Sequence, residues 1–148
     1  MQKEYKGLIG EGRKFLSGLL GRIVLIPIPL GKKGPVLKGW QHITYEDTQK
    51  TEVQLELLAR ELAGGNIGVK CGPDSDRLVV VDIDATELLE DFINRFPFLT
   101  ETTVSRAKRG AKFWFRLAGG CEFPALGVVT LKGDKGEKIG EFALGRRR

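Results

Sequence analysis

Residues 77–84 read Arg-Leu-Val-Val-Val-Asp-Ile-Asp, a run of apolar, mostly β-branched residues that predicts a buried strand ending in two carboxylates. Alternate side chains of a strand share a face, so Asp82 and Asp84 project together while Val81 and Ile83 project to the other side. Neighbouring carboxylates repel each other unless a positive charge lies between them, and their oxygens suit Mg²⁺ or Mn²⁺. Two such ions can hold a phosphoryl group during its transfer. The alternative is that both acids are solvated at a strand end, with Asp84 capping the next helix.

The composition predicts one domain with a continuous core. The 148 residues are 41% hydrophobic, which is sufficient for such a core without disulfides. Cys71 and Cys121 lie far apart and neither belongs to a CxxC motif, so we expect a reduced, cytoplasmic protein. The amino terminus lacks the apolar core of a signal peptide, and the longest apolar run, residues 23–30, is too short to cross a bilayer. We therefore expect no association with a membrane.

The positive charge of the chain is unevenly distributed. The formal net charge is +5, and basic residues gather in one segment and at the carboxyl terminus: Lys108, Arg109, Lys112, Arg116 and Arg146 to Arg148. Such clusters suit a polyanion such as a nucleic acid. The alternative interpretation of a charge run is an ordinary solvated surface.

The order of predicted elements indicates an α+β architecture. Hydrophobic periodicity predicts helices over residues 2–20, 53–62 and 85–96, and strands over residues 23–28, 66–70 and 78–83. Thr44 and Asp47 resemble a capping box before the second helix. Two hairpins follow, pairing residues 102–106 with 112–117 and residues 126–131 with 138–144. We expect a mostly antiparallel sheet with helices packed on one side.

The first predicted hairpin carries a cationic turn and a mixed strand face. Lys108, Arg109 and Gly110 form the turn, where backbone amides freed by glycine and basic side chains could bind a triphosphate. On the following strand, Lys112, Trp114 and Arg116 share one face, which is compatible with stacking on a nucleotide or single strand. The alternative is an exposed face on which the lysine and arginine stems cover the indole.

Several short motifs occur in a recognisable order along the chain. They are Lys38-Gly39-Trp40 followed by Thr44, Asn66-Ile67-Gly68-Val69 with Gly72, Leu78 to Asp84, Ser105 with Arg109 to Phe115, and Gly140-Glu141-Phe142. In this order they resemble the amino-terminal catalytic domain of the bifunctional DNA primase/polymerases of archaeal plasmids, viruses and integrated elements, within the archaeo-eukaryotic primase superfamily. The resemblance implies a sheet like that of RNA-recognition motifs, joined to a small N-terminal α/β unit, with the active site in the cleft between them.

The resemblance also implies roles for individual residues. Asp82, Asp84 and Glu141 would be the catalytic acids that hold a two-metal site of Mg²⁺ or Mn²⁺. The expected triphosphate contacts are Ser105, Lys108, Arg109, Gly110 and Lys112, and the expected nucleic-acid contacts are Lys38, Trp40, Trp114 and Arg116. The expected partners are nucleoside triphosphates and a single-stranded or primed DNA template, with a helicase domain or subunit as a further candidate.

The sequence departs from the family pattern at two places. Lys112 stands where the family has a phosphate-binding histidine, which keeps positive charge but changes its geometry. The strand and "PPS" loop that follow the third acid in the family are absent, so we expect residues 1–148 to form a single prim-pol-like domain that is truncated or degenerate at its carboxyl end. Two alternatives to a primase/polymerase therefore stay open: a catalytically degenerate nucleic-acid-binding module of the same fold, and a metal-dependent nuclease.

Overall fold

The computed structural model describes residues 18–106, 108–125 and 127–145. Nearly all of the helix predicted over residues 2–20 lies outside this part. The chain divides into two compact units, residues 1–70 and 71–148, which are described separately below. The described elements form a mixed α+β fold with antiparallel sheets and few helices, as predicted. The finer expectation, an RRM-like sheet with a small N-terminal α/β unit, stays a prediction, as does the single domain.

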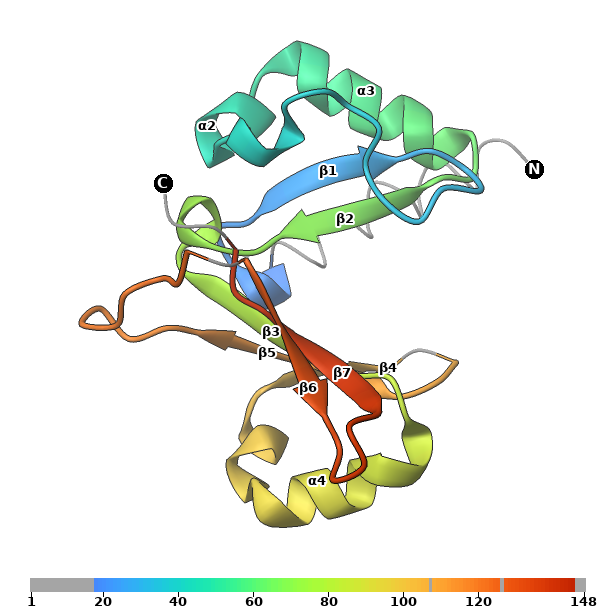
Figure 1. Cartoon of the computed structure of the whole chain (residues 1–148). Coiled ribbons are helices and arrows are strands. Elements are labelled where there is room, and N and C mark those ends of the chain that lie inside the picture. The colour runs from blue at the N-terminus through green and yellow to red at the C-terminus, as the bar shows by residue number, and fades with distance from the viewer. Residues whose placement is uncertain (1–17, 107, 126, 146–148) are drawn as a thin grey trace. The chain divides into compact units, whose positions relative to one another are not determined.

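In the described part of the first unit, a two-stranded sheet is joined by the helices α2 (Tyr45–Thr48) and α3 (Thr51–Leu62). Strand β1 (Val24–Ile28) pairs antiparallel with β2 (Asn66–Lys70). Along the chain, the 3-10 turn η1 (Trp40–His42) and the helices α2 and α3 come between the two strands (Figure 1). Helix α3 packs against the sheet, where the fully buried Leu57 and Ile26 supply apolar surface. The strands predicted over residues 23–28 and 66–70 and the helix over 53–62 are therefore confirmed.

A capping box begins helix α2, as the sequence predicts. The Thr44 hydroxyl accepts the Asp47 amide at 3.1 Å, and the Asp47 carboxylate accepts the Thr44 amide at 3.0 Å. Lys50 Nζ lies 2.9 Å from the second carboxylate oxygen of Asp47. The hydrogen bond from the Thr44 backbone, followed by that from Lys50, lowers the pKa of Asp47 to about 2.

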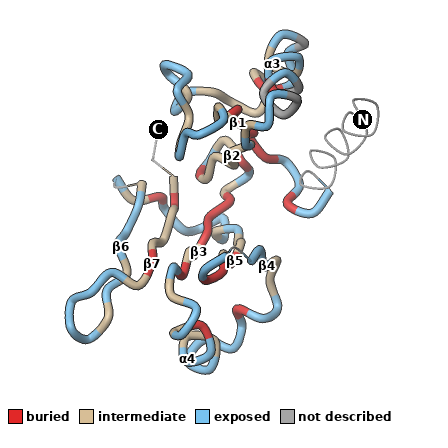
Figure 2. The backbone as a smooth tube through the Cα atoms, turned by 90° about the vertical axis from the view of Figure 1, so that its right-hand side faces the viewer, coloured by how far each residue is buried: buried red, intermediate tan, exposed pale blue. Residues whose placement is uncertain are grey.

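The second unit is built on a five-stranded antiparallel sheet with the order β4-β5-β3-β7-β6 (Figure 1). The strands are β3 (Leu78–Ile83), β4 (Thr103–Arg106), β5 (Ala111–Arg116), β6 (Val128–Lys132) and β7 (Lys138–Ala143). Both predicted hairpins are confirmed as the pairs β4–β5 and β6–β7. The two hairpins flank β3, so the strand that carries the Asp-Ile-Asp motif is central and largely buried (Figure 2).

Helical segments cover one face of this sheet. Ile83 and Phe113 belong to a buried cluster with Leu89, from helix α4 (Leu89–Arg95), and Leu99, from the 3-10 turn η4 (Pro97–Glu101). The prediction of one helix over residues 85–96 is wrong at its start, because a separate 3-10 turn, η3 (Thr86–Leu88), precedes α4. The alternative role of Asp84 as a helix cap is also wrong, since Ala85 occupies that position and makes no side-chain cap.

Arg77 fixes the entry into β3. Asp76 and Arg77 both adopt left-handed backbone conformations, with φ of 52° and 63°. The Arg77 guanidinium donates to the carbonyl oxygens of Leu117 at 3.1 Å and Ala118 at 2.8 Å, and also to that of Cys121. These bonds hold the loop after β5 beside the start of β3. None of the helices in the described ranges has the length and hydropathy of a bilayer-spanning segment.

Candidate functional site

A row of five polar residues crosses the sheet at the level of Asp82. Asp82 is the direct partner of Lys112 on β5 and of Glu141 on β7, and the row continues to Ser105 on β4 and Thr130 on β6. Directly opposed residues of antiparallel strands share a face, with Cα atoms about 4.5–5.5 Å apart. We call these five residues the polar row. The backbone register therefore brings two of the three predicted acids, Asp82 and Glu141, side by side on one face.

A β-bulge adds Lys138 to the same face. Leu131 pairs with Gly140, whereas the next residue of β6, Lys132, pairs with Lys138, so Ile139 is an extra residue on β7. Residues three apart in a regular strand point to opposite faces, but the extra residue restores Lys138 to the face of Glu141. The Lys138 Nζ lies 2.6 Å from Glu141 Oε1. Sequence periodicity alone would assign this lysine to the wrong face.

Each of the two paired carboxylates bonds a lysine. Lys112 forms an ion pair with Asp82 Oδ2, and Lys138 forms one with Glu141. The pKa of Lys138 is raised, first by its hydrogen bond to Glu141 and further by the negative charges of Glu141, Asp84 and Asp82. These side chains are partly exposed, at 40% for Lys112, 26% for Asp82, 50% for Lys138 and 39% for Glu141, so water screens both pairs.

Asp84 lies just beyond the end of β3. Its backbone amide donates to the Ile139 carbonyl at 2.9 Å, which extends the contact between β3 and β7 by one residue. The residue is exposed, and its charge contributes to the raised pKa of Lys138. Asp84 is therefore close enough to the acidic pair to act on the same lysine.

The acids have the right chemistry for a hard divalent cation, since carboxylate oxygens are the ligands that Mg²⁺ and Mn²⁺ prefer. The side chains of Asp82 and Glu141 are nevertheless paired with lysines, and within the described ranges no three His, Cys, Asp or Glu residues are grouped so that they could hold a metal ion. The three-carboxylate metal site of Asp82, Asp84 and Glu141 stays a prediction.

Gly110 has a packing function that the sequence does not reveal. Its φ is +70°, and a β-carbon there would collide with the Ile83 carbonyl at the end of β3. Its amide donates to the Thr86 hydroxyl at 2.9 Å, so this amide is engaged rather than available for a phosphate. Lys108 and Arg109 precede it and are exposed. The predicted cationic turn is thus anchored to the end of β3, and its two basic side chains are exposed to solvent.

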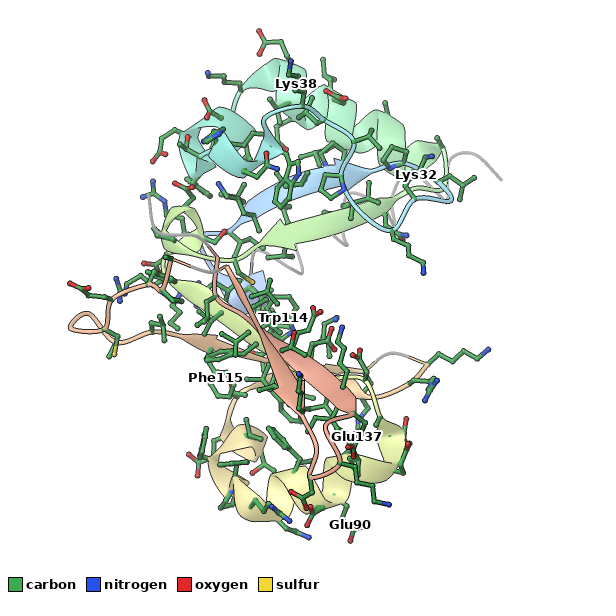
Figure 3. The ribbon with its side chains drawn as sticks, viewed as in Figure 1. Lys32, Lys38, Glu90, Trp114, Phe115 and Glu137 are labelled. Atoms are coloured by element: carbon green, nitrogen blue, oxygen red, sulfur yellow. The ribbon has the colours of Figure 1, made fainter. Side chains whose placement is uncertain are left out.

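Trp114 and Arg116 lie on the same face as the polar row, as predicted from strand alternation. Figure 3 shows Trp114 and Phe115 on opposite sides of β5. The Trp114 indole N–H donates to the Ser105 hydroxyl at 2.9 Å, which links the predicted stacking residue to a predicted phosphate contact. Arg116 Nε donates to Asp76, at 3.1 Å from its carbonyl and 3.2 Å from its carboxylate. Arg116 is therefore already engaged by an acid.

The other two predicted nucleic-acid contacts, Lys38 and Trp40, belong to the first unit. Lys38 is exposed in the loop before η1 (Figure 3), and Trp40 is the first residue of that 3-10 turn. Gly39 between them has a φ of +78°, which glycine adopts without strain. The loop thus presents Lys38 to solvent, and a role for either residue in nucleic-acid binding stays a prediction.

Comparison with known proteins defines the family. The family model described as "Bifunctional DNA primase/polymerase, N-terminal" matches residues 20–138, which is most of the chain. The match includes Asp82, Asp84 and Lys112, and ends before Glu141. A search of curated proteins finds no match. The chain belongs to the bifunctional DNA primase/polymerase N-terminal family.

Proposed function

We propose that this chain is a metal-dependent nucleotidyltransferase that extends or initiates strands on a DNA template. Membership of the family suggests a DNA primase/polymerase-type function. The observation that carries the finer proposal is the cross-strand pairing of Asp82 with Glu141 on one face of the sheet. Two carboxylates fixed by backbone register are what a metal-assisted phosphoryl transfer needs, because the charge of the transition state must be opposed by positioned cations.

In the proposed reaction, a 3′-hydroxyl attacks the α-phosphorus of a nucleoside triphosphate and pyrophosphate leaves. Asp82 and Glu141, with Asp84, would hold Mg²⁺ or Mn²⁺, which supplies the charge that neutralises pyrophosphate and lowers the pKa of the attacking hydroxyl. Lys112, next to Asp82, would contact the triphosphate. Trp114 lies two residues beyond Lys112 on β5, on the same face, and would stack on a base.

The exposed basic residues of the turn would extend this binding surface. Lys108 and Arg109 are exposed and precede a glycine that packs against the Ile83 carbonyl at the end of β3, and we propose that their charges attract the triphosphate. A cationic side chain beside the acids lets a triphosphate approach carboxylates that would otherwise repel it. The proposed setting is the replication of plasmid, viral or integrated DNA, with a helicase domain or subunit as a partner.

Primer extension tests the proposal. A labelled primer on a single-stranded template is incubated with the four deoxynucleotides or ribonucleotides and with Mn²⁺ or Mg²⁺. We expect elongation by the wild-type chain and none by the Asp82→Ala/Asp84→Ala double variant. Asp91→Asn is the matched control, because it removes an exposed carboxylate and its 3.2 Å ion pair with Arg95 on α4. A folded wild-type chain that binds DNA and never elongates the primer would disprove the proposal.

A second candidate is a binding module of the same fold without turnover. The lysines bonded to Asp82 and Glu141 favour it, since both carboxylates then have counter-ions of their own. Binding of single-stranded DNA that persists in a chelator, without synthesis under any condition, would identify this function. A nuclease would instead degrade the template without nucleoside triphosphates, and the same gel reveals it.

A further inference from the structure

Lys112 and Lys138 occupy the two carboxylates on which the proposed metal site depends. Lys112 reaches Asp82 from β5, and Lys138 reaches Glu141 from beyond the bulge on β7. With Asp84, the three acids carry three negative charges and the two lysines two positive charges, so one negative charge remains. The two lysines therefore compensate most of the negative charge of the three acids.

Both lysines can break their ion pairs with Asp82 and Glu141 at little cost. Their side chains are 40% and 50% exposed, so either ammonium can rotate into water without opening the core. Screened ion pairs of this kind are weak, and breaking one changes an equilibrium by up to about fivefold. A divalent ion bound by two carboxylates is a stronger competitor than either lysine, since its charge is doubled and it coordinates directly.

We propose that Lys112 and Lys138 are exchangeable counter-ions. They pair with Asp82 and Glu141 when no metal is bound, and they turn to the phosphates of the nucleotide when a divalent ion takes the carboxylates. This inference rests on the proposed function. It adds Lys138 to the residues that contact the triphosphate, and it links the two ligands: metal releases the lysines that nucleotide needs, so each ligand strengthens binding of the other.

The inference predicts opposite effects on the two ligands. In Lys112→Met and Lys138→Met the apolar stem is kept and the charge is lost, so the carboxylates lose a competitor and the triphosphate loses a cation. We expect Mn²⁺ alone to bind each variant up to about fivefold more tightly, measured by calorimetry, and the double variant on the order of tenfold more tightly. The affinity for dATP in saturating Mn²⁺ should fall in the same variants.

The matched control is Lys135→Met, which removes an exposed lysine from the turn of the same hairpin. We expect this variant to bind Mn²⁺ and dATP as wild type does, because the inference assigns the change in affinity to the two ion-paired lysines and not to the general surface charge. Thermal unfolding establishes that each variant is folded, and Lys112→Gln and Lys138→Gln replace any variant that is not.

Two results would overturn the inference. If the folded variants bind Mn²⁺ no more tightly than wild type, the lysines do not compete with metal, and primer extension by the wild-type chain still supports the proposed function. If wild type and variants all fail to bind Mn²⁺ and wild type fails to extend a primer, both the inference and the proposed function are wrong.

Discussion

Asp82 on β3 and Glu141 on β7 are direct partners in an antiparallel pair, although helix α4 and the strands β4, β5 and β6 lie between them along the chain. The relation depends on register, since a slip of one residue would turn Glu141 to the opposite face. Gly140 protects this register, because a β-carbon there would collide with the backbone carbonyl of Asp82. The residue before the proposed third acid is thus a glycine for a steric reason.

We predict that Asp82 matters to chemistry far more than to stability. The Asp82→Asn variant should change the free energy of unfolding by about 1 kcal/mol or less, because its ion pair with Lys112 is partly exposed. Primer extension should fall by at least about 100-fold, because the transition state loses a metal ligand. Urea unfolding and extension rates measured on one preparation give both values.

Asp91→Asn serves as the control for this prediction, since it breaks a more exposed ion pair on α4. It should lose no more stability than Asp82→Asn and should keep the activity of wild type. An Asp82→Asn chain that extends primers at the wild-type rate would show that this carboxylate holds no catalytic ion.

We predict that Gly110→Ala destabilises the second unit. The alanine would need a positive φ and would force its β-carbon onto the Ile83 carbonyl, so the turn must leave the end of β3. We expect a loss of about 1–3 kcal/mol in the free energy of unfolding. Gly119→Ala is the control, because nothing lies within 4 Å of its β-carbon. Equal stability of the two variants would contradict the steric role.

Much of the fold could be predicted from local sequence. The β-branched run 78–83 and the glycine-containing turns of both hairpins are local signals, and these elements form where the sequence predicts them. The helix predicted from residue 85 begins only at Leu89, and in the 3-10 turn before it the Thr86 hydroxyl accepts a hydrogen bond from the Gly110 amide of the β4–β5 turn. This contact joins segments that are distant in sequence, so helical periodicity within residues 85–96 gives no sign of it.

The candidate site was predictable only in part, for a similar reason. Strand alternation places Asp82 with Asp84, and Lys112 with Trp114, on shared faces. Strand alternation fails for Lys138, because the extra residue Ile139 reverses the face on which the preceding residues of β7 lie. No residue pattern in this segment predicts the bulge. The ion pairs of Lys112 and Lys138 depend on cross-strand register, which the sequence of a single chain does not encode locally.

We predict that the capping box of α2 makes stability depend on pH in the acid range. The pKa of Asp47 is about 2 in the folded protein, below its ordinary value of 3.8. The unfolded chain therefore takes up the proton first, so the contribution of Asp47 is present above about pH 4 and is lost as the pH falls toward 2. Urea unfolding between pH 2 and 6 should show a shallower dependence in Asp47→Asn.

Thr44→Ser is the control for the capping box, because it keeps the hydroxyl that accepts the Asp47 amide. It should retain the wild-type pH profile. An Asp47→Asn profile that follows wild type throughout this range would mean that the box does not hold the carboxylate ionised.

We predict that Trp114 binds single-stranded DNA by stacking. The indole lies on the face of the polar row and is oriented by its bond to the Ser105 hydroxyl, so its ring is preorganised. Trp114→Ala should weaken binding of an oligothymidine by about 1–3 kcal/mol, measured by fluorescence anisotropy, and Trp114→Phe by less, because a ring remains. Phe98→Ala is the matched control: Phe98 is an exposed aromatic of the same unit whose ring packs near Phe115, on the opposite face. If Trp114→Ala and Phe98→Ala bind the oligonucleotide equally, the face of the polar row is not where the strand lies.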